Sequence, residues 1–280
     1  MSAATSMLFV HAHPDDESIG TGLTMAHYAA LGARVTLVTC TRGESGDVMP
    51  PELRYLEADG DALGSHRATE LHAACAELGV TDQRFLGGAG RWRDSGMPGT
   101  PPNDDPRAFW RAGVEEAGAC LAEVVREVRA DVVVTYDEDG GYGHPDHVQA
   151  HRVSRWAFEH AATTSAPDSW RPRRFYAIAT PLSLLRDSVG RGPFPTPDSV
   201  EAYGFGTPDE RITSRVADDK AYAAKLRALR AHRSQLALDG DWFALTDGVG
   251  QPLGGPVEHF VRLAGEPGSG PDGLEAGLTG

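Results

Sequence analysis

Two short stretches of the 280-residue chain gather histidines and carboxylates in places where a core would not need them. The first is His13-Pro14-Asp15-Asp16, which follows an apolar run over residues 7–10. Imidazole and carboxylate groups together suit Zn²⁺ or Fe²⁺. Helix capping alone explains an Asp at a helix start, and Pro14 is common there, but capping leaves His13 unexplained. The stretch therefore indicates a helix cap or a metal site, and His13 favours the metal.

The second stretch spans residues 140–147 and contains Tyr142, His144, Asp146 and His147 among glycines. Taken alone, it is also explained by a Gly-rich turn with a capping Asp146. Together with the first stretch, its two imidazoles complete a mixed nitrogen and oxygen ligand set. Three protein ligands leave one position open for water, which is the catalytic arrangement of zinc. A further carboxylate can then take a proton from water, whose pKa zinc lowers to roughly 7.

Both stretches follow segments that we expect to be buried parallel strands. The expected strands are apolar or β-branched runs at residues 7–10, 35–40, 83–86, 131–136 and 175–180. The expected helices span residues 16–31, 61–78, 107–129 and 146–162. This alternation predicts an α/β fold with a doubly wound, mostly parallel, Rossmann-like sheet. In such sheets the site lies at the carboxyl ends of the strands, near the switch in strand order.

The chain is expected to divide into a core and a smaller, irregular C-terminal lobe. Residues 1–180 form the Rossmann-like core, residues 181–263 pack on it, and residues 264–280 form a Gly- and Pro-rich mobile tail. The expected elements of the lobe are strands at residues 211–216 and 259–263 and a helix at residues 219–232.

Composition argues against several classes of protein. The formal net charge is −14, with 40 acidic and 26 basic residues, which disfavours nucleic acid or an anionic membrane surface as a partner. The first residues lack the features of a signal peptide, and no run approaches the roughly 20 apolar residues of a membrane span. Cys40, Cys75 and Cys120 are too few and too widely spaced for a disulfide framework. We expect a cytoplasmic protein with no obligate protein partner.

Residues 11–18 together with residues 144–147 resemble the PIG-L/LmbE-like zinc deacetylases, which remove an N-acetyl group from a glucosamine derivative. The loop at residues 86–97 is more specific. It points to the branch of the family that acts on N-acetyl-glucosaminyl-inositol in mycothiol biosynthesis. The resemblance covers most of the first 180 residues and thins after Pro181. It implies a hydrolase that releases acetate from a small amino-sugar substrate.

The resemblance also implies roles for four residues of the two stretches. His13, Asp16 and His147 match the metal ligands, with Zn²⁺ as the implied cofactor and Fe²⁺ as an alternative. Asp15 matches the general base, which takes a proton from water and returns it to the leaving amine.

Four further residues match functional positions of the family. His144 matches a general acid or oxyanion stabiliser, and Tyr142 matches a mobile tyrosine that polarises the amide carbonyl. Arg67 and Asp94 match positions that contact the substrate. The neighbouring Asp146 either orients His144 or caps the helix.

Other functions compete with hydrolysis of N-acetyl-glucosaminyl-inositol. A mycothiol S-conjugate amidase, or another N-acetyl-sugar deacetylase, keeps the fold and the metal but changes the substrate. A non-catalytic metal-dependent sugar-binding module does not need Asp15 beside the ligands. A dinucleotide-binding oxidoreductase is disfavoured, because Gly20-Thr21-Gly22 falls inside an expected helix and position 25 is Met.

Overall fold

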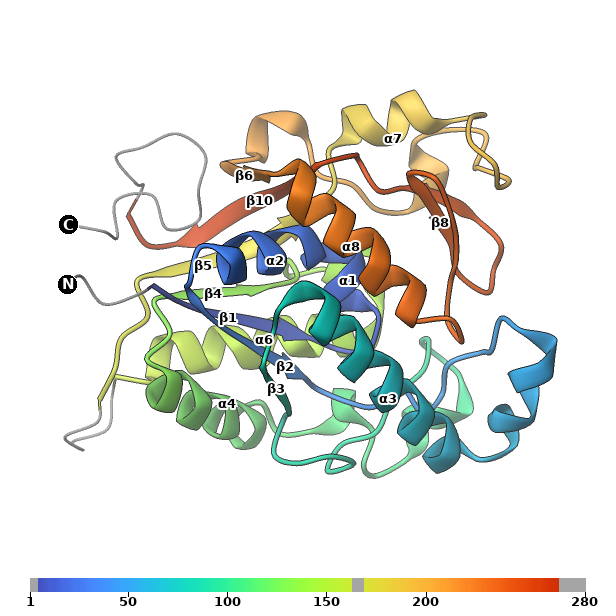
Figure 1. The fold of residues 1–280 in the computed structure, drawn as a ribbon. Helices are drawn as coiled ribbons and strands as arrows, with labels where there is room; N and C mark the ends of the chain where they lie inside the picture. The colour runs from blue at the N-terminus through green and yellow to red at the C-terminus, as the bar shows by residue number, and fades with distance from the viewer. Residues whose placement is uncertain (1–4, 163–168, 267–280) are drawn as a thin grey trace.

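A seven-stranded sheet forms the centre of the protein (Figure 1). The computed structural model describes residues 5–162 and 169–266. The strands of this sheet are β1 Ser6–His11, β2 Arg34–Thr39, β3 Asp82–Phe85, β4 Val132–Thr135, β5 Arg174–Ala179, β6 Ser214–Ala217 and β10 Val257–Ala264. They lie in the order β3-β2-β1-β4-β5-β10-β6. The first five are parallel, and β10 runs antiparallel to both β5 and β6. The predicted α/β fold with a mostly parallel sheet is therefore confirmed.

Helices cover both faces of the sheet, as the alternating sequence pattern predicts (Figure 1). The longer helices are α2 Gly22–Ala30, α3 Gly60–Leu78, α4 Val114–Val128, α6 Pro145–His160 and α8 Asp219–Ala231. The shorter ones are α1 Asp16–Gly20, α5 Gly140–Gly143 and α7 Leu182–Ser188, with 3-10 turns at Pro51–Ala58, Pro101–Asp104, Phe109–Arg111, Glu201–Tyr203 and Asp209–Arg211. Side chains of β1 alternate between the two faces: Met7 and Phe9 pack with α2, α3 and α8, whereas Leu8 and Val10 pack with α4 and α6.

The helix predicted over residues 16–31 is broken in the structure. It consists of α1 and α2, which are separated by Thr21. The carboxylate of Glu258 accepts hydrogen bonds from the Leu23 and Thr24 amides at 3.0 and 2.9 Å. Because the first amides of a helix lack partners within it, this buried carboxylate favours a new helix start at Gly22. A residue 235 positions away supplies the cap, so the local pattern does not predict the break.

The helix predicted over residues 107–129 begins later, at Val114. Arg93 and Ala108 form a parallel bridge, in which the Phe109 amide donates to the Arg93 carbonyl at 2.9 Å. This bridge holds the start of the predicted helix in an extended form, and a 3-10 turn follows it.

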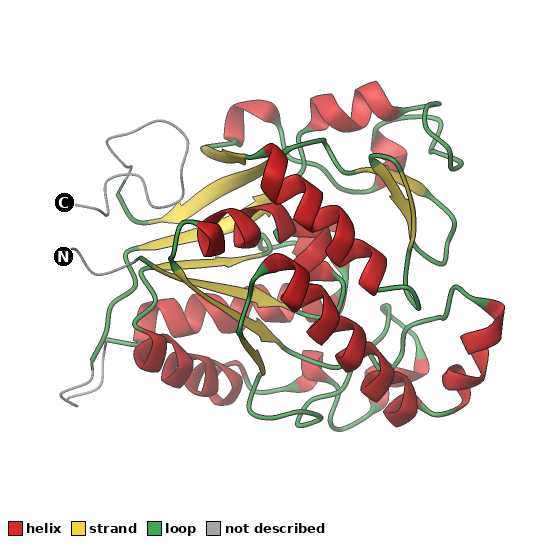
Figure 2. Cartoon of the chain, in the orientation of Figure 1, coloured by secondary structure: helices red, strands yellow, loops and turns green. Residues whose placement is uncertain are grey.

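The segment after residue 180 contributes to the main sheet and also forms a sheet of its own. It supplies β6, β10 and α8, and α8 packs against α2 and α3. A separate antiparallel sheet consists of β7 Ala237–Asp239, β8 Trp242–Ala244 and β9 Gly250–Pro252 (Figure 2). The strand predicted over residues 211–216 begins only at Ser214. Of the expected tail, residues 267–280 lie outside the described residues.

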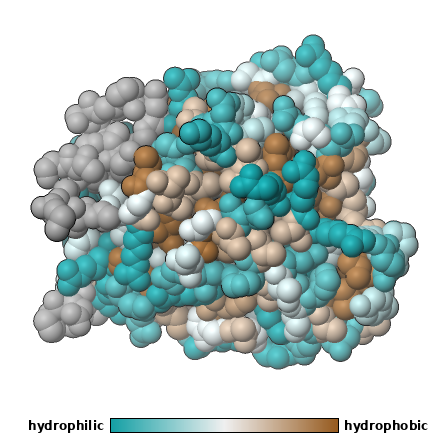
Figure 3. Space-filling view, in the orientation of Figure 1, coloured by the Kyte–Doolittle hydropathy of each residue, from teal (hydrophilic) through white to brown (hydrophobic). Residues whose placement is uncertain are grey.

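The surface carries both hydrophilic and hydrophobic residues. Hydrophilic residues spread over the face seen in Figure 3, with smaller hydrophobic areas between them. Within residues 5–162 and 169–266, the helices are too short or too polar to cross a membrane.

The contact between α4 and α6 leaves no room at Gly118. A Cβ atom added to Gly118 would lie 2.5 Å from the Trp156 ring. Gly118→Leu is therefore expected to lower the free energy of unfolding by about 1–3 kcal/mol, the usual cost of overpacking. Urea unfolding measures this. The control is Ala119→Leu on the exposed face of the same helix. Equal stabilities of the two variants would contradict this account of the contact.

Candidate active site

The two polar stretches meet at the carboxyl ends of neighbouring strands. Strand β1 pairs with β2 on one side and with β4 on the other, so the order of the strands switches between β1 and β4. His13, Asp15 and Asp16 follow β1, while His144 and His147 follow β4. The expectation that the site lies at a topological switch point agrees with this arrangement.

Three of these side chains form a mixed set of donors. One carboxylate oxygen of Asp16 lies 3.3 Å from Nδ1 of His13, and the other lies 3.4 Å from Nε2 of His147. His13, His144 and His147 also place one ring nitrogen each within 4.8 Å of one another. Nε2 of His147 is buried and has no hydrogen-bond partner among the described residues. A buried nitrogen without a partner, facing a carboxylate, fits a metal ion as the group that completes the cluster.

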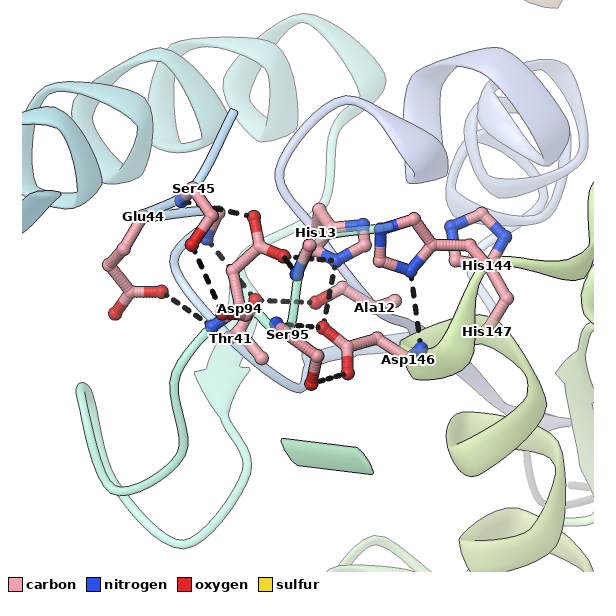
Figure 4. A network of polar contacts seen from close by, with 12 residues as sticks. Ala12, His13, Thr41, Glu44, Ser45, Asp94, Ser95, His144, Asp146 and His147 are labelled. Atoms are coloured by element: carbon pink, nitrogen blue, oxygen red, sulfur yellow. Dashed lines mark hydrogen bonds and ion pairs between the residues drawn. The ribbon is translucent and has the colours of Figure 1, made fainter. Parts of the chain in front are cut away.

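His13 also contacts a second group of carboxylates (Figure 4). Its Nε2 lies 3.2 Å from the Asp146 carboxylate and 3.5 Å from that of Asp94. The amide and hydroxyl of Ser95 donate to Asp146 in turn. Asp146 therefore orients His13 through its carboxylate. Asp146 contacts His144 as well, but through its backbone amide and not through this carboxylate.

The charged groups of the cluster shift one another's pKa values. Burial alone would lower the pKa of His13, but Asp94, Asp146 and Asp16 raise this pKa well above its usual value. Burial would likewise raise the pKa of Asp16, yet His147 and His13 hold it well below its usual value. The carboxylates thus favour positive charge at the centre of the cluster, which a divalent cation also supplies.

Asp15 has an unusual backbone. Its φ of 117° and ψ of −37° lie in a region that non-glycine residues rarely adopt. The Asp15 amide donates to Glu17 at 2.9 Å, and its carbonyl accepts from Ser18 and Ile19 at 3.0 Å each. These hydrogen bonds hold the backbone in a conformation whose strain costs on the order of 1–3 kcal/mol. As a result, Asp15 and Asp16 direct their carboxylates to different partners.

The Asp15 carboxylate is buried beside Arg67. Burial raises the pKa of Asp15 to about 6, against the lowering effect of the Arg67 guanidinium. One guanidinium nitrogen of Arg67 donates to the Pro14 carbonyl at 2.6 Å and contacts Asp15 at 3.2 Å. The other terminal nitrogen donates to the Gly43 carbonyl at 2.8 Å. Arg67 thus braces the turn, and it also lines the pocket where the resemblance expects a substrate contact.

The second stretch presents two further groups. Nδ1 of His144 accepts a hydrogen bond from the Asp146 amide at 3.2 Å, so the neutral ring carries its proton on Nε2. Burial, with His13 and His147, lowers the pKa of His144 to about 3. Tyr142 is 45% exposed at the pocket and lies edge-on to His147. It stands between glycines with positive φ, which gives its backbone unusual freedom.

Three residues near the site were not predicted from the sequence. The ring of Tyr136 stacks on His147, with centroids 4.1 Å apart, and its hydroxyl accepts from the Ala12 amide at 2.9 Å. Glu17 and His232 are fully buried and contact each other at 2.7 Å. The position of Tyr136 at the end of a strand is a weak local signal. Glu17 and His232 have none, since they are 215 residues apart.

The cluster opens into a pocket of about 510 Å³. Asp15, Asp94 and Tyr142 line it on the side of the core. The segment after residue 180 also lines it, with apolar residues that include Leu184, Phe205, Phe243 and Leu253 and with polar ones such as Gln251. The pocket thus combines many polar and charged groups with apolar side chains, which suits a polar small molecule such as a sugar.

Comparisons with known proteins point to one family. Residues 8–158 match the model of PIG-L, described as GlcNAc-PI de-N-acetylase. A protein of Thermobifida fusca (strain YX), named 1D-myo-inositol 2-acetamido-2-deoxy-alpha-D-glucopyranoside deacetylase, is 55% identical over 97% of this chain and 98% of its own. A protein of Thermomonospora curvata with the same name is also 55% identical, over 97% of this chain and 95% of its own.

A solved structure shares the fold at low sequence identity. The N,N'-diacetylchitobiose deacetylase from Pyrococcus horikoshii superposes with a TM-score of 0.56 at 19% identity, over 82% of this chain and 70% of that chain. At such identity, the likeness shows the fold alone, and the chemistry must come from the site.

The unpartnered Nε2 of His147 leads to a prediction about metal. If His147 is a ligand, His147→Ala removes one of three donors and is expected to lower bound zinc well below one ion per chain. Metal analysis of the purified protein after dialysis measures this. His72→Ala, at an exposed position of α3, is the control and should retain the wild-type content. Full zinc content in His147→Ala would exclude His147 as a ligand.

Proposed function

The chain belongs to the PIG-L family of deacetylases, and from that premise we propose that it hydrolyses the N-acetyl amide of 1-O-(2-acetamido-2-deoxy-glucopyranosyl)-myo-inositol. The products are acetate and glucosaminyl-inositol, as in mycothiol biosynthesis. Relatives with this activity in their names match nearly the full length of the chain, including the segment after residue 180 that lines the pocket. A small amino sugar is accordingly the proposed substrate.

One feature of the site carries the proposal. One pocket contains the cluster of three imidazoles and, beside it, the buried carboxylate of Asp15. Among the described residues, this carboxylate forms an ion pair with Arg67 and has no hydrogen bond or ion pair with the three imidazoles. A binding module needs the donors alone. Hydrolysis of an amide also needs a group that moves protons, and Asp15 supplies it.

His13, Asp16 and His147 are the proposed metal ligands. Zn²⁺ is the proposed ion, and Fe²⁺ suits the same nitrogen and oxygen donors. When bound, the ion supplies Lewis acidity, which brings the pKa of water toward neutrality and polarises a carbonyl. Asp146 and Asp94 hold the His13 ring, so the ligand is oriented before the ion binds.

Asp15 and His144 are the proposed catalytic groups. Asp15 takes a proton from the attacking water and returns it to the amine that leaves. The Nε2–H of His144 donates to the amide oxygen as negative charge develops there. The bond from the Asp146 amide to Nδ1 favours this tautomer, which supports stabilisation of the oxyanion by His144 over general acid catalysis.

Three residues are proposed to contact the substrate. Tyr142 stands at the exposed side of the pocket, where its hydroxyl can donate to the amide carbonyl. Arg67 and Asp94 line the same pocket and are proposed to bind hydroxyl groups of the sugar. Both terminal nitrogens of Arg67 already contact Gly43, Pro14 and Asp15, so the same guanidinium would hold the catalytic turn and face the sugar.

A mycothiol S-conjugate amidase is the second candidate function. The apolar residues Leu184, Phe205 and Phe243 in the pocket lining favour it, because they can contact a bulky apolar group beside the sugar. The reaction would still be metal-dependent hydrolysis of an amide on the same amino sugar.

A carboxylate at position 15 is expected to be essential for turnover. Asp15→Asn should keep its zinc and lose on the order of 10²–10⁴ in kcat, the usual contribution of a general acid–base group. Asn tolerates positive φ as Asp does, so the change isolates the carboxylate. An acetate-release assay on N-acetyl-glucosaminyl-inositol measures the effect. The control is Asp187→Asn, at an exposed position of α7. Near-normal kcat in Asp15→Asn would remove this residue from the role of base.

The two candidate functions differ in the substrate that is turned over fastest. We expect kcat/KM for N-acetyl-glucosaminyl-inositol to exceed that for a mycothiol S-conjugate when both are assayed with the same zinc-loaded protein. The reverse order would favour the amidase. No turnover of either substrate, or of other N-acetylated amino sugars, would favour a binding module.

A further inference from the structure

The carboxylate of Glu17 has no part in the proposed chemistry, yet it lies directly behind the catalytic turn. It is fully buried. One oxygen accepts the Asp15 amide at 2.9 Å. The other accepts the Ser18 hydroxyl at 2.5 Å and contacts Nε2 of His232 at 2.7 Å. Glu17 therefore joins the unusual backbone of Asp15 to a residue from the far end of the chain.

His232 follows the last turn of α8 and is also fully buried. Its Nε2 faces Glu17, so this nitrogen donates the hydrogen bond. Its Nδ1 has no hydrogen-bond partner among the described residues. Glu17 is thus the hydrogen-bond partner of the His232 side chain, and loss of the His232 ring would leave the buried carboxylate with only the Asp15 amide and the Ser18 hydroxyl as donors. Removing one member of a buried pair is strongly unfavourable for the group that remains.

The position of Asp15 depends on this carboxylate. A φ of 117° is unfavourable for Asp and persists only where surrounding contacts hold it. The amide of Asp15 points at Glu17, and Glu17 is held by His232. Without His232, the Glu17 side chain can move away and break its hydrogen bond with the Asp15 amide. The Asp15 backbone can then return to a less strained conformation. A displacement of about 1 Å at a reacting group can cost 10²-fold in rate.

We propose that Glu17 and His232 form a positioning pair that fixes the backbone of Asp15, so that α8 sets the placement of the catalytic base. The inference rests on the proposed function. It assigns to the segment after residue 180 a second task besides lining the pocket. Neither residue is among those that line the pocket.

Other contacts of α8 allow positioning to be separated from simple bracing. His27 on α2 contacts Asp218, the N-cap residue of α8, at 2.9 Å. This pair also ties α8 to the core, but it does not contact the catalytic turn. If α8 only needs to be attached to the core, loss of the His27–Asp218 pair should lower kcat as much as loss of the Glu17–His232 pair.

The test compares His232→Leu with His27→Leu in zinc-loaded protein. His232→Leu is expected to lower kcat on N-acetyl-glucosaminyl-inositol by on the order of 10–100-fold, as for residues that orient an active group. KM and zinc content should stay near their wild-type values. His232→Gln can donate to Glu17 from nearly the same place and should recover part of the loss. His27→Leu should leave kcat unchanged.

The most discriminating experiment introduces His232→Leu into the Asp15→Asn variant, which lacks the catalytic base. In Asp15→Asn, His232→Leu is expected to cause no further loss of residual rate, because residues that act through one group are not additive. An equal fold-loss in both backgrounds, or wild-type kcat in His232→Leu, would overturn the positioning role.

Failure of this inference can be distinguished from failure of the proposed function. If the wild-type protein releases no acetate, the function is wrong. If the wild type is active and His232→Leu matches it, only the positioning pair is wrong. Should His232→Leu fail to fold, Glu17→Gln, which keeps the size of the side chain, is measured in the same two backgrounds against the same expectations.

Discussion

The backbone of Asp15 is the constraint on which the site depends. Two adjacent aspartates must serve different partners: Asp16 contacts His13 and His147, while Asp15 faces Arg67. The chain achieves this with a φ of 117° at Asp15. Strain of this kind is typical of functional sites and needs surrounding contacts that hold it. Here a buried carboxylate and a buried guanidinium provide those contacts.

The sheet brings the two halves of the site together. His13 and Asp146 are 133 residues apart, yet they are in contact because β1 and β4 are adjacent and parallel. Both stretches leave the same edge of the sheet, and each enters a helix. A doubly wound sheet forms a crevice at this point, so the ligands need no separate scaffold. The segment after residue 180 then covers the crevice and turns it into a pocket.

The clusters of histidines and aspartates in the sequence predicted the central part of this site. The contacts between residues far apart in the sequence could not be predicted from it. His13, Asp16 and His147 stand beside apolar runs that end in polar turns, and such runs predict parallel strands. The break at Thr21 depends on Glu258, the orientation of His13 depends on Asp146, and neither partner is a neighbour in sequence. After residue 180, strands β6 to β9 have only three or four residues each, too few for a clear periodicity, whereas the eight-residue β10 was predicted only over residues 259–263.

One metal site, split between two strand ends, is proposed to carry out amide hydrolysis. The most direct measurement is a titration of metal-free protein with zinc, in which acetate release from N-acetyl-glucosaminyl-inositol is followed. We predict that the rate rises in proportion to bound zinc and reaches its maximum at a single ion per chain. Acetate release by the metal-free protein, or zinc binding without any acetate release, would contradict the account.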